Sequence, residues 1–276
     1  MTILNKDTTL CISLAGRPSN IGTRFHNYLY DELGLNFAYK AFTTRDLEGA
    51  IRGVRALGIR GCSVSMPFKE LVIPLTDELT ASAQAIESVN TIVNDDGHLT
   101  AYNTDYEATV ELIGRHEPGR PALDRASPVL LRGSGGIAKA VVAAFRDAGF
   151  GDLTVLARNQ AAGRALADRY GYRWVRDEPP AGAGVIVNAT PLGMNGPDAG
   201  ALAFPLPYIE AARAVFDVVA SPSETPLVRA ARAAGKPVIT GAEVIALQAA
   251  RQFGLYTGVS LTAEQVERAS AYSREA

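Results

Sequence analysis

Blocks of apolar residues alternate with segments of helical periodicity in the N-terminal part of the chain. The apolar runs at 9–15, 37–41 and 59–66 predict strands, since each lies between polar or glycine-containing turns. Between them, apolar residues recur every three or four positions over 23–33 and 44–57, and a glycine follows each segment. That spacing predicts two helices, so this part should fold as alternating strands and helices.

Polar residues between these runs refine the prediction. Thr43 and Asp46 have the spacing of a capping box at the start of the second helix. Farther along, the apolar runs 88–94 and 98–103 flank an Asp-Asp-Gly turn, which is a strong signal for a hairpin. A helix is predicted directly after this hairpin, over 106–115.

The pattern breaks at 115–127, where prolines, a glycine and charges replace the apolar periodicity and predict a linker or surface crossing. A second surface loop is predicted at 176–184. Beyond the linker a new series of alternating elements begins, which favours parallel sheets and an α/β fold class. Its strands are predicted at 128–132, 153–157, 185–188, 214–218 and 237–239, and its last helices at 242–253 and 262–273.

Composition narrows the range of partners. The net charge is −2 and the pI is about 6.0, so there is no basic excess for nucleic acid. The N-terminus lacks the pattern of a signal peptide, and no apolar run reaches the length of a membrane span. Cys11 and Cys62 lie in predicted strands, which indicates buried, reduced thiols. We expect a cytoplasmic protein, a monomer or homodimer, whose partner is a small molecule.

The segment VLLRGSGGIAKA at 129–140 carries a glycine-rich loop. Its glycines follow an apolar strand and open an apolar helix, which is the context that a dinucleotide-binding loop requires. One glycine would allow the tight turn, the next a close approach to a pyrophosphate, and the small Ala138 close packing of helix on strand. The helix N-terminus would present N–H groups to the phosphates. The predicted cofactor contacts in this loop are Gly133, Ser134, Gly135, Gly136 and Ile137.

The next predicted strand ends near Arg158, about 20 residues farther on. Chains that bind NAD usually have Asp or Glu at this point, and the carboxylate accepts from the ribose 2′-hydroxyl. A guanidinium suits a 2′-phosphate instead, so Arg158 predicts NADP. Arg164 lies farther along the following helix. The alternative is that Arg158 is an ordinary solvated residue at a helix start.

Lys69, Asn90 and Asp105 are the candidates for chemistry. Lys69 follows a Pro-Phe pair just past a strand end, where α/β proteins place ligands, although alone it could be a surface lysine. Asn90 lies within an apolar strand. Asp105 closes an Asn-Thr-Asp sequence at another strand end, where Asn and Asp also serve as helix caps. The lysine could exchange a proton with a substrate oxygen while a nicotinamide exchanges hydride.

Segments spread over almost the whole chain resemble, in order, motifs of the shikimate/quinate dehydrogenase family. SMPFKE, SVNT and NTD resemble its (N)VT(V)PFKE, AVNT and NTD segments, which implies that Lys69 and Asp105 are the catalytic pair and Asn90 a substrate ligand. GSGG resembles its phosphate loop, and VNATPLGM, FDVVASPSETPL and GAEVIALQAA resemble three further motifs. These imply a substrate ligand at Gln248 and cofactor contacts at Thr190, Leu192, Val218 and Gly241.

The resemblance implies reversible, NADP-dependent reduction of 3-dehydroshikimate to shikimate, a step of aromatic amino acid biosynthesis through the chorismate pathway. It also implies two domains with the active site in the cleft between them. The substrate-binding domain would comprise 1–106 and 241–276, and the Rossmann-type NADP-binding domain 107–240. No metal is expected, since the three histidines, His26, His98 and His116, lack ligand spacing.

Several positions depart from the family pattern. The family holds the substrate carboxylate with two serines near the N-terminus, and here those positions fall near Asn20 and Gly22. The other departures are Ser65 for threonine, Ala157 for asparagine, Ala220 for tyrosine, Glu243 for glycine and Val244 for methionine. Together they resemble the divergent shikimate dehydrogenase-like branch, in which PSNxGTxFHNYLYD recurs. That resemblance implies weak activity on shikimate itself.

The turn PSNIGTRFHN at 18–27 therefore becomes a candidate acid-binding element. Asn20, Thr23 and Ser65 are the predicted substrate contacts there, and Arg24 could supply charge or face solvent. Two other readings stay open. One is a non-catalytic NADPH-binding regulator on the same fold, and the other is a quinate-, aminoshikimate- or methylenetetrahydrofolate-type dehydrogenase. The presence of Lys69, Asn90 and Asp105 together favours an enzyme over a regulator.

Overall fold

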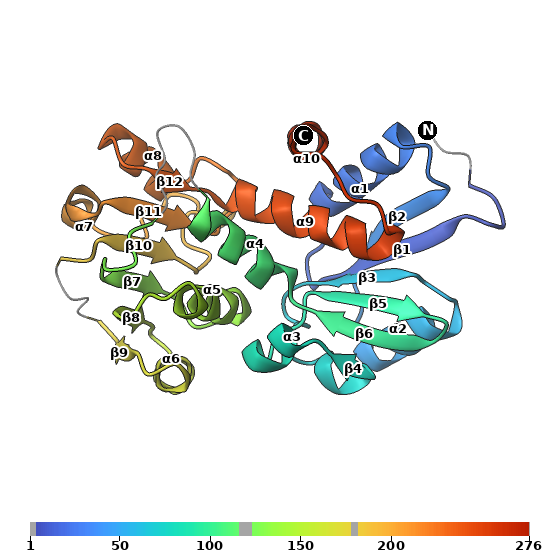
Figure 1. Cartoon of the computed structure of the whole chain (residues 1–276), viewed down its shortest axis with the longest axis horizontal. Coiled ribbons are helices and arrows are strands. Elements are labelled where there is room, and N and C mark those ends of the chain that lie inside the picture. The colour runs from blue at the N-terminus through green and yellow to red at the C-terminus, as the bar shows by residue number, and fades with distance from the viewer. Residues whose placement is uncertain (1–3, 116–122, 178–181, 276) are drawn as a thin grey trace. The chain divides into compact units, whose positions relative to one another are not determined.

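The computed structural model describes residues 4–115, 123–177 and 182–275. Within these ranges the chain follows the alternation of strands and helices that its apolar pattern predicts (Figure 1). The predicted linker at 115–127 and the predicted loop at 176–184 lie partly outside the described residues.

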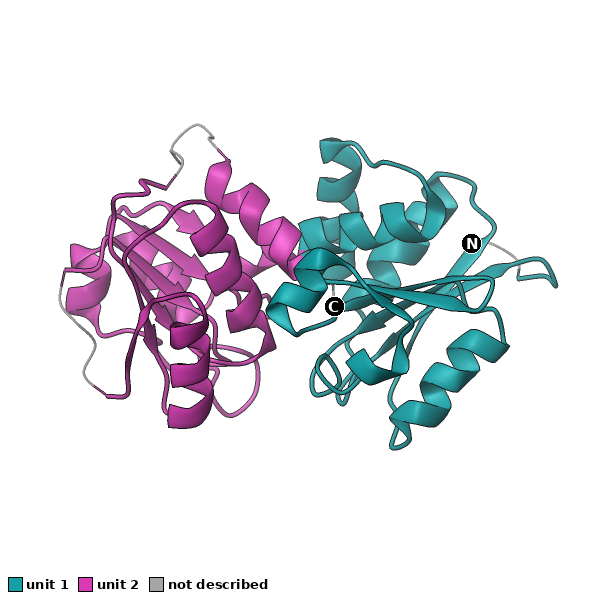
Figure 2. Ribbon diagram, turned by 60° about the horizontal axis from the view of Figure 1, so that its bottom comes forward, with its two compact units in different colours: residues 1–104, 246–276 teal, residues 105–245 magenta. Residues whose placement is uncertain are grey.

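The chain divides into two compact units, which Figure 2 distinguishes by colour. Unit 1 combines Met1–Thr104 with Ala246–Ala276, whereas unit 2 is the continuous segment Asp105–Ile245. The N-terminal unit therefore includes the C-terminal end of the chain. The predicted boundaries, after residue 106 and before residue 241, lie close to these points.

Unit 1 is built on a mixed sheet with the strand order β2-β1-β3-β5-β6-β4. β1 pairs in parallel with β2 and β3, while β5 is antiparallel to β3 and β6, which confirms the predicted hairpin. The two-residue β4 was not predicted, because it is too short to show a period. The strands are β1 Thr9–Leu14, β2 Phe37–Phe42, β3 Gly61–Val64, β4 Glu78–Leu79, β5 Thr91–Asp95 and β6 His98–Tyr102.

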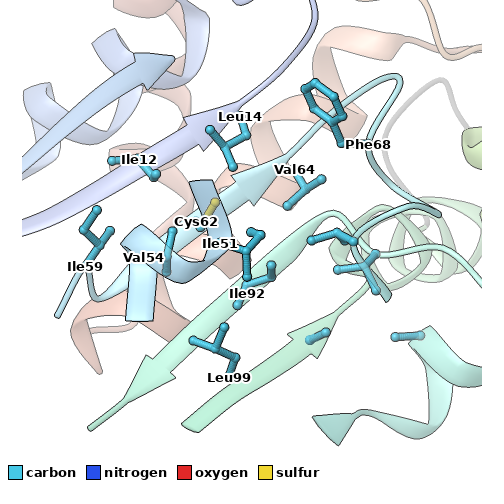
Figure 3. Packing of buried hydrophobic residues seen from close by; sticks show 14 residues of the cluster. Ile12, Leu14, Ile51, Val54, Ile59, Cys62, Val64, Phe68, Ile92 and Leu99 are labelled. Atoms are coloured by element: carbon cyan, nitrogen blue, oxygen red, sulfur yellow. The ribbon is translucent and has the colours of Figure 1, made fainter. Parts of the chain in front are cut away.

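Helices cover both faces of this sheet. They are α1 Ile21–Glu32, α2 Leu47–Ala56, the 3₁₀ helix η1 Ile73–Leu75, α3 Ala81–Ile86, α9 Gly241–Thr257 and α10 Ala263–Arg274. Adjacent residues of β1 point to opposite faces. Ile12 packs with Ile51 and Val54 of α2 in the cluster shown in Figure 3. Cys11 packs on the other face, with Phe25 of α1 and Phe253 of α9.

The helix ends follow local rules with one correction. Gly34 and Gly58 lie at positive φ just after α1 and α2, where the sequence placed helix stops. The predicted capping box of Thr43 and Asp46 is wrong, because α2 begins later, at Leu47. Asp46 is itself the N-cap, and its carboxylate accepts from the N–H of Gly49 at 2.8 Å. Both cysteines are buried and free of disulfides, as predicted.

Unit 2 contains a parallel sheet with the order β12-β11-β10-β7-β8-β9, the doubly wound order typical of dinucleotide-binding domains. The predicted α/β class is therefore confirmed. The strands are β7 Val129–Arg132, β8 Leu153–Leu156, β9 Arg173–Val175, β10 Val185–Asn188, β11 Ala214–Asp217 and β12 Val238–Ile239. The helices are α4 Thr104–Gly114, α5 Gly136–Asp147, α6 Gln160–Arg169, α7 Leu206–Ala211 and α8 Pro226–Ala233. The short edge strand β9 was not predicted.

One departure from the family pattern has a structural role at the start of α9. The carboxylate of Glu243 accepts from the N–H and from the hydroxyl of Thr240, both at 2.8 Å. The hydroxyl of Thr240 in turn accepts from the N–H of Glu243 at 3.4 Å. This arrangement is a capping box, which satisfies N–H groups that a helix otherwise leaves unpaired. Glu243 therefore stabilises the start of α9.

His26 of α1 is fully buried among aromatic rings. Its ring stacks on Tyr39 with the centres 4.4 Å apart and lies 6.0 Å from Phe253. Neither ring nitrogen makes a hydrogen bond of ordinary geometry to a described residue. Burial lowers the pKa of His26 to about 3, and the nearby amide of Gln252 opposes that shift only in part. The histidine is therefore a neutral core residue.

This burial predicts a specific acid sensitivity. Between pH 6.5 and 3 the unfolded chain protonates His26 but the folded chain does not, so stability falls as the pH falls through that range. Relative to His26→Phe, the wild type should lose roughly 2 kcal/mol of unfolding free energy between pH 7 and pH 5. Urea unfolding at the two pH values measures this difference. The exposed His98, replaced by Gln, is the control, and equal losses in wild type and His26→Phe would contradict the assignment.

Candidate active site

Lys69 lies in the turn that leaves the C-terminal end of β3. Phe68, directly before it, is 9% exposed and packs into the cluster of Figure 3, so the turn is anchored in the core as the sequence predicts. Ser65, another predicted contact, is exposed in the same turn. The carbonyl of Lys69 accepts from the N–H of Val89 at 2.8 Å. This bond ties the lysine to the segment that contains Asn90.

Asn90 is 2% exposed, and its neighbours fix its side chain. The backbone N–H of Thr104 and the hydroxyl of Thr91 both donate to its Oδ1 at 2.8 Å. With that oxygen committed as an acceptor, Nδ2 donates to Oε1 of Gln248 at 3.1 Å. The amide of Gln248 is thereby oriented as well, with Nε2 as its donor end. The structure therefore brings together two predicted substrate residues that are far apart in sequence.

Further polar side chains, which the sequence analysis did not single out, extend this network. Gln252 donates to the hydroxyl of Thr91 at 2.8 Å. It also accepts from the hydroxyl of Ser63 at 3.1 Å, and Ser63 lies 2.6 Å from the hydroxyl of Tyr39. A Cβ on Gly22 would stand 3.6 Å from the same tyrosine oxygen. A continuous hydrogen-bonded path thus connects Asn90 with the neighbourhood of the turn at 18–27.

Two of these three residues, Gln252 and Ser63, carried a signal in the sequence. Gln252 follows Gln248 by one helical turn, which places both on one side of α9. Ser63 precedes Ser65 by two residues, the spacing that repeats a direction along an extended chain. Tyr39 was counted only as part of an apolar strand. Periodicity could therefore have identified two of the three, but it gives no sign that they bond to one another.

Asp105 lies in the first turn of α4 and is 4% exposed. It directly follows Thr104, whose N–H and hydroxyl both donate to Asn90, at 2.8 and 3.2 Å. Asn103, which opens the same motif, is buried and donates to the carbonyl of Ser88 at 2.8 Å. The first two residues of the Asn-Thr-Asp sequence therefore fix the start of α4, the helix whose first turn contains Asp105.

The turn at 18–27 agrees with its prediction only in part. Asn20 is exposed at the N-cap of α1, and its side chain makes no capping hydrogen bond. The hydroxyl of Thr23 is enclosed and has no hydrogen-bond partner among the described residues. The guanidinium of Arg24 lies 4.8 Å from the ring centre of Tyr272 in α10. Arg24 therefore contributes to the packing of α1 on α10.

The predicted cofactor residues of unit 2 all follow the C-terminal ends of its parallel strands. The register aligns Arg132 of β7 with Leu156 of β8 and with Asn188 of β10, and Asn188 with Asp217 of β11. The residues after these positions therefore share one edge of the sheet, where doubly wound folds bind their ligands. They are Gly133, Ser134, Gly135, Gly136 and Ile137 after β7, Arg158 after β8, Thr190 and Leu192 after β10, Val218 after β11 and Gly241 after β12.

Two glycines of the loop have different physical roles. Gly133 has a φ of 130°, and a Cβ on it would stand 2.5 Å from the carbonyl oxygen of Ala189. Only glycine allows this close passage of the β7 and β10 ends. Gly135 is the exposed N-cap of α5 with an ordinary φ of −82°, and a Cβ on it would meet nothing within 4 Å. The space around Gly135 is therefore open to a ligand.

Asp217 holds together the loops that follow β10 and β11. One carboxylate oxygen accepts from Asn188 and from the N–H of Val219, both at 3.0 Å, and the other accepts from the hydroxyl of Thr225 at 2.6 Å. Burial raises the pKa of Asp217 to about 6, although these donors oppose the shift. Asn188 also accepts from the hydroxyl of Thr190 at 2.6 Å. Thr190 is thereby held in place at the edge of the sheet.

Arg158 is exposed just past the end of β8. The residue after it, Asn159, caps α6 by accepting from the N–H of Ala162 at 3.1 Å, so the cap does not involve the arginine. Arg164 lies with its guanidinium 4.8 Å from the ring centre of Trp174. Of the two arginines that the sequence analysis named, Arg158 is therefore the one at the strand end.

Neither a metal-binding cluster nor a membrane-spanning helix is found in the part of the chain that the structure describes. No cluster of three or more His, Cys, Asp or Glu side chains there could hold a metal ion, and His116 lies outside that part. No described helix is long and apolar enough to cross a membrane. The candidate groups are therefore the amides, the lysine and carboxylate of the N-terminal motifs, and the glycine loop.

The chain is similar to known proteins over nearly its whole length. It is 56% identical over 273 residues to a shikimate dehydrogenase-like protein of Haemophilus influenzae, a match that covers 99% of both chains. The chain belongs to the shikimate dehydrogenase family. Its residues 20–92 also match the family model of the shikimate dehydrogenase substrate binding domain. The resemblance inferred from the motifs is therefore confirmed.

Solved members of the shikimate dehydrogenase family have the same fold. Shikimate 5-dehydrogenase of Thermus thermophilus, in complex with NADP(H) and shikimate, matches with a TM-score of 0.85 at 31% identity, over 96% of this chain and 99% of that one. Quinate dehydrogenase of Corynebacterium glutamicum, in complex with NAD, matches with a TM-score of 0.85 at 28% identity, over 96% and 98%. Solved structures of the family thus include one complex with NADP(H) and one with NAD.

The two loop glycines should respond differently to the same substitution. Gly133→Ala should lower the unfolding free energy by roughly 2–5 kcal/mol, because it combines an unfavourable φ with a clash against Ala189. Gly135→Ala should cost at most about 1 kcal/mol, the difference between Gly and Ala at an N-cap. Thermal and urea unfolding of both variants measure the contrast. Equal stability of the two variants would show that the close passage at Gly133 imposes no constraint.

Proposed function

We propose that the protein is an NADP-dependent oxidoreductase that interconverts a cyclic hydroxy acid and its ketone. Lys69 and Asp105 form the proton relay, and Asn90 and Gln248 bind substrate oxygens. The Thermus thermophilus relative, which binds NADP(H) and shikimate, supports this reaction class. The observation that supports the proposal is the backbone hydrogen bond from the N–H of Val89 to the carbonyl of Lys69, which ties the turn that contains the lysine to the segment that contains Asn90.

Lys69 supplies the proton for the reaction. Its ammonium donates to the carbonyl oxygen of the ketone as that oxygen gains negative charge, and in the reverse direction its amine takes the proton from the hydroxyl. The nicotinamide, when bound, supplies or accepts the hydride. Asp105 accepts a hydrogen bond from a substrate hydroxyl and keeps the lysine oriented.

The oriented amides determine which substrate atoms can face them. Oδ1 of Asn90 is committed to the donors of Thr91 and Thr104, and its Nδ2 donates to Gln248 and to the hydroxyl of Thr104. Nε2 of Gln248 is then the donor end of the pair, so it favours an acceptor such as a hydroxyl or carboxylate oxygen. This polarity suits an oxygen-rich ring and disfavours a ligand that presents only donors.

The glycine loop of unit 2 fits a dinucleotide. Gly135 leaves open space for a phosphate, and the first turn of α5 has N–H groups without intrahelical partners. Thr190 and Leu192 follow β10 along the same sheet edge, held by the Asn188–Asp217 hydrogen bond. Val218 and Gly241 continue that edge, and we propose them as contacts for the rest of the cofactor.

Arg158 supports NADP as the cofactor. The quinate dehydrogenase relative binds NAD, so family membership alone leaves the choice of cofactor open. The position after β8 faces the adenosine ribose in doubly wound folds, where a carboxylate would accept from a 2′-hydroxyl. An exposed guanidinium at this point offers charge-assisted hydrogen bonds to a 2′-phosphate instead.

The altered turn at 18–27 favours an acid other than shikimate. Each serine hydroxyl lost from the family pattern would have given a charge-assisted hydrogen bond worth about 1.5–3 kcal/mol. Asn20 is exposed and can replace one of them, whereas the hydroxyl of Thr23 is enclosed and Arg24 packs on Tyr272. We therefore expect weak turnover of shikimate. Ala220 leaves room for a substituent that a tyrosine would exclude.

Lys69→Met should lower kcat for a ring hydroxy acid by roughly 10²- to 10⁴-fold, the usual contribution of a general acid–base group. NADPH affinity should not change, because unit 2 is unaltered. The matched control is Lys40→Met, which removes an exposed lysine of β2 in the same unit and should keep full activity. NADP reduction with shikimate, quinate and related acids, followed by absorbance, measures kcat, and NADPH fluorescence measures binding.

Two results would argue against this proposal in different ways. A wild-type protein that binds NADPH but turns over no acid of the panel would favour the non-catalytic regulator. A Lys69→Met variant with unchanged kcat would leave the dehydrogenase intact but remove Lys69 from the relay.

A further inference from the structure

Arg132 is a second arginine at the edge of the unit 2 sheet, and the sequence analysis gave it no role. It is the last residue of β7 and directly precedes Gly133 of the glycine loop. The parallel register pairs it with Leu156 of β8, so Arg158 follows on the adjacent strand only two residues beyond the partner of Arg132. Two guanidinium groups thus belong to neighbouring strand ends, beside the loop proposed to bind the cofactor phosphates.

The side chain of Arg132 is held by an apolar contact. Its guanidinium lies 5.4 Å from the ring centre of Phe204, a fully buried residue. Phe204 packs in a cluster with Leu130 and Leu156, so this contact lies on the face of the sheet that α7 and α8 cover. A guanidinium stacked on a fixed ring loses less freedom when it binds a ligand than a solvated one does.

One donor of this cation, Nε, has no hydrogen-bond partner in the described part of the chain. Nε of Arg132 is buried, and no described carboxylate forms an ion pair with the group. The nearest aligned acid along the register, Asp217 of β11, already accepts from Asn188, Val219 and Thr225. The half-buried arginine keeps its charge, so leaving its buried Nε–H unpaired is unfavourable.

The positive charge of Arg158 is a second unfavourable influence on the charged form of Arg132. The pKa of Arg132 is lowered, first by burial and second by the positive charge of Arg158. Two like charges at neighbouring strand ends, without a described carboxylate between them, repel one another. An anion that both can contact would remove the repulsion and complete the hydrogen bonding of Arg132 at the same time.

We propose that Arg132 is a further specificity-determining residue and that it binds, together with Arg158, the 2′-phosphate of the adenosine ribose. The inference rests on the proposed NADP-dependent function and adds a residue to its cofactor site. A phosphomonoester carries close to two negative charges and three acceptor oxygens, which match two guanidinium groups better than one. A 2′-hydroxyl offers neither, so the pair also acts against NAD, because bound NAD would leave both charges uncompensated.

The test separates the 2′-phosphate from the rest of the cofactor. Calorimetry on the full-length protein at pH 7.5 gives the Kd of adenosine 2′,5′-bisphosphate and of adenosine 5′-monophosphate, which differ only by the 2′-phosphate. Their ratio is measured for wild type, Arg132→Met, Arg132→Lys and Arg158→Met. Methionine keeps the length and apolar contact of the side chain on Phe204 but removes the charge.

Wild type should prefer the bisphosphate, and Arg132→Met should reduce that preference by about 10- to 100-fold without changing the Kd of the monophosphate. Arg158→Met should have a similar effect, and Arg132→Lys should restore part of the preference, because lysine keeps the charge but not the planar fork. Arg146→Met is the control. That arginine also lies over a ring, 5.8 Å from the centre of Tyr170, but at the far end of α5 from the glycine loop.

Three outcomes would overturn the inference. An unchanged preference in Arg132→Met, with Arg158→Met showing the loss, would leave the proposed function standing and remove Arg132 from the site. Equal weakening of both ligands would show that Arg132 contacts the adenine or the 5′-phosphate. No preference in the wild type would remove the 2′-phosphate site and the NADP assignment together. Near-equal melting temperatures of the variants ensure that the comparison is between folded proteins.

Discussion

The hydrogen bond from the backbone N–H of Thr104 to Oδ1 of Asn90 fixes the polarity of the buried network in unit 1. A backbone N–H can only donate, so this end of the amide must be the oxygen. Nδ2 of Asn90 must then donate to Gln248, and the hydroxyl of Thr91, which donates to the same Oδ1, must accept from Gln252. Reversing one member would leave buried donors facing one another, at a cost of about 1–3 kcal/mol for each unsatisfied group. The network therefore has a single low-energy arrangement, and the same backbone bond positions the start of α4.

Unit 2 is organised by a steric constraint and a buried carboxylate. The ends of β7 and β10 pass so closely at Gly133 and Ala189 that no side chain fits between them, which aligns the two strand ends along one edge. Asp217 then connects the loops after β10 and β11 through three donors. Both devices use backbone and short side chains, and at the same edge a Cβ on Gly135 would meet nothing within 4 Å. The larger groups at this edge include Arg158 and Arg132, which we propose to distinguish NADP from NAD.

Most elements of the fold could be predicted from the sequence because their apolar periods are long enough to identify a helix or a strand. Strand β9, Arg173–Val175, could not, since three residues show no alternation and only pairing with β8 gives it structure. The start of α2 was misjudged because Thr43 and Asp46 offer two competing caps, and only the backbone geometry decides between them.

The residues of the candidate site also fall into two groups, those that sequence motifs indicate and those that only the fold brings to the site. The motifs that resemble those of the family indicated Lys69, Asn90, Asp105 and Gln248 as candidates, because each residue stands within such a motif. The roles of Ser63, Gln252 and Arg132 depend on which strand or helix lies next to them. Arg132 in particular ends an apolar run, so its type looked incidental until the register placed it beside the end of β8. Pairing between distant segments is the information that a periodicity analysis lacks.

The discontinuous composition of unit 1 has a consequence for synthesis on the ribosome. One face of its sheet is covered by Ala249, Phe253 and Tyr256 of α9 and by Ala269 of α10, which are synthesised after unit 2. Until then, the apolar surface of α1 and β2 around Phe25, Leu29 and Tyr39 lacks its cover. Unit 2 is continuous and can close its own core first. Unit 2 can therefore be folded while this apolar surface of unit 1 is still uncovered. Until α9 and α10 are made, that surface is the part of unit 1 most prone to aggregation.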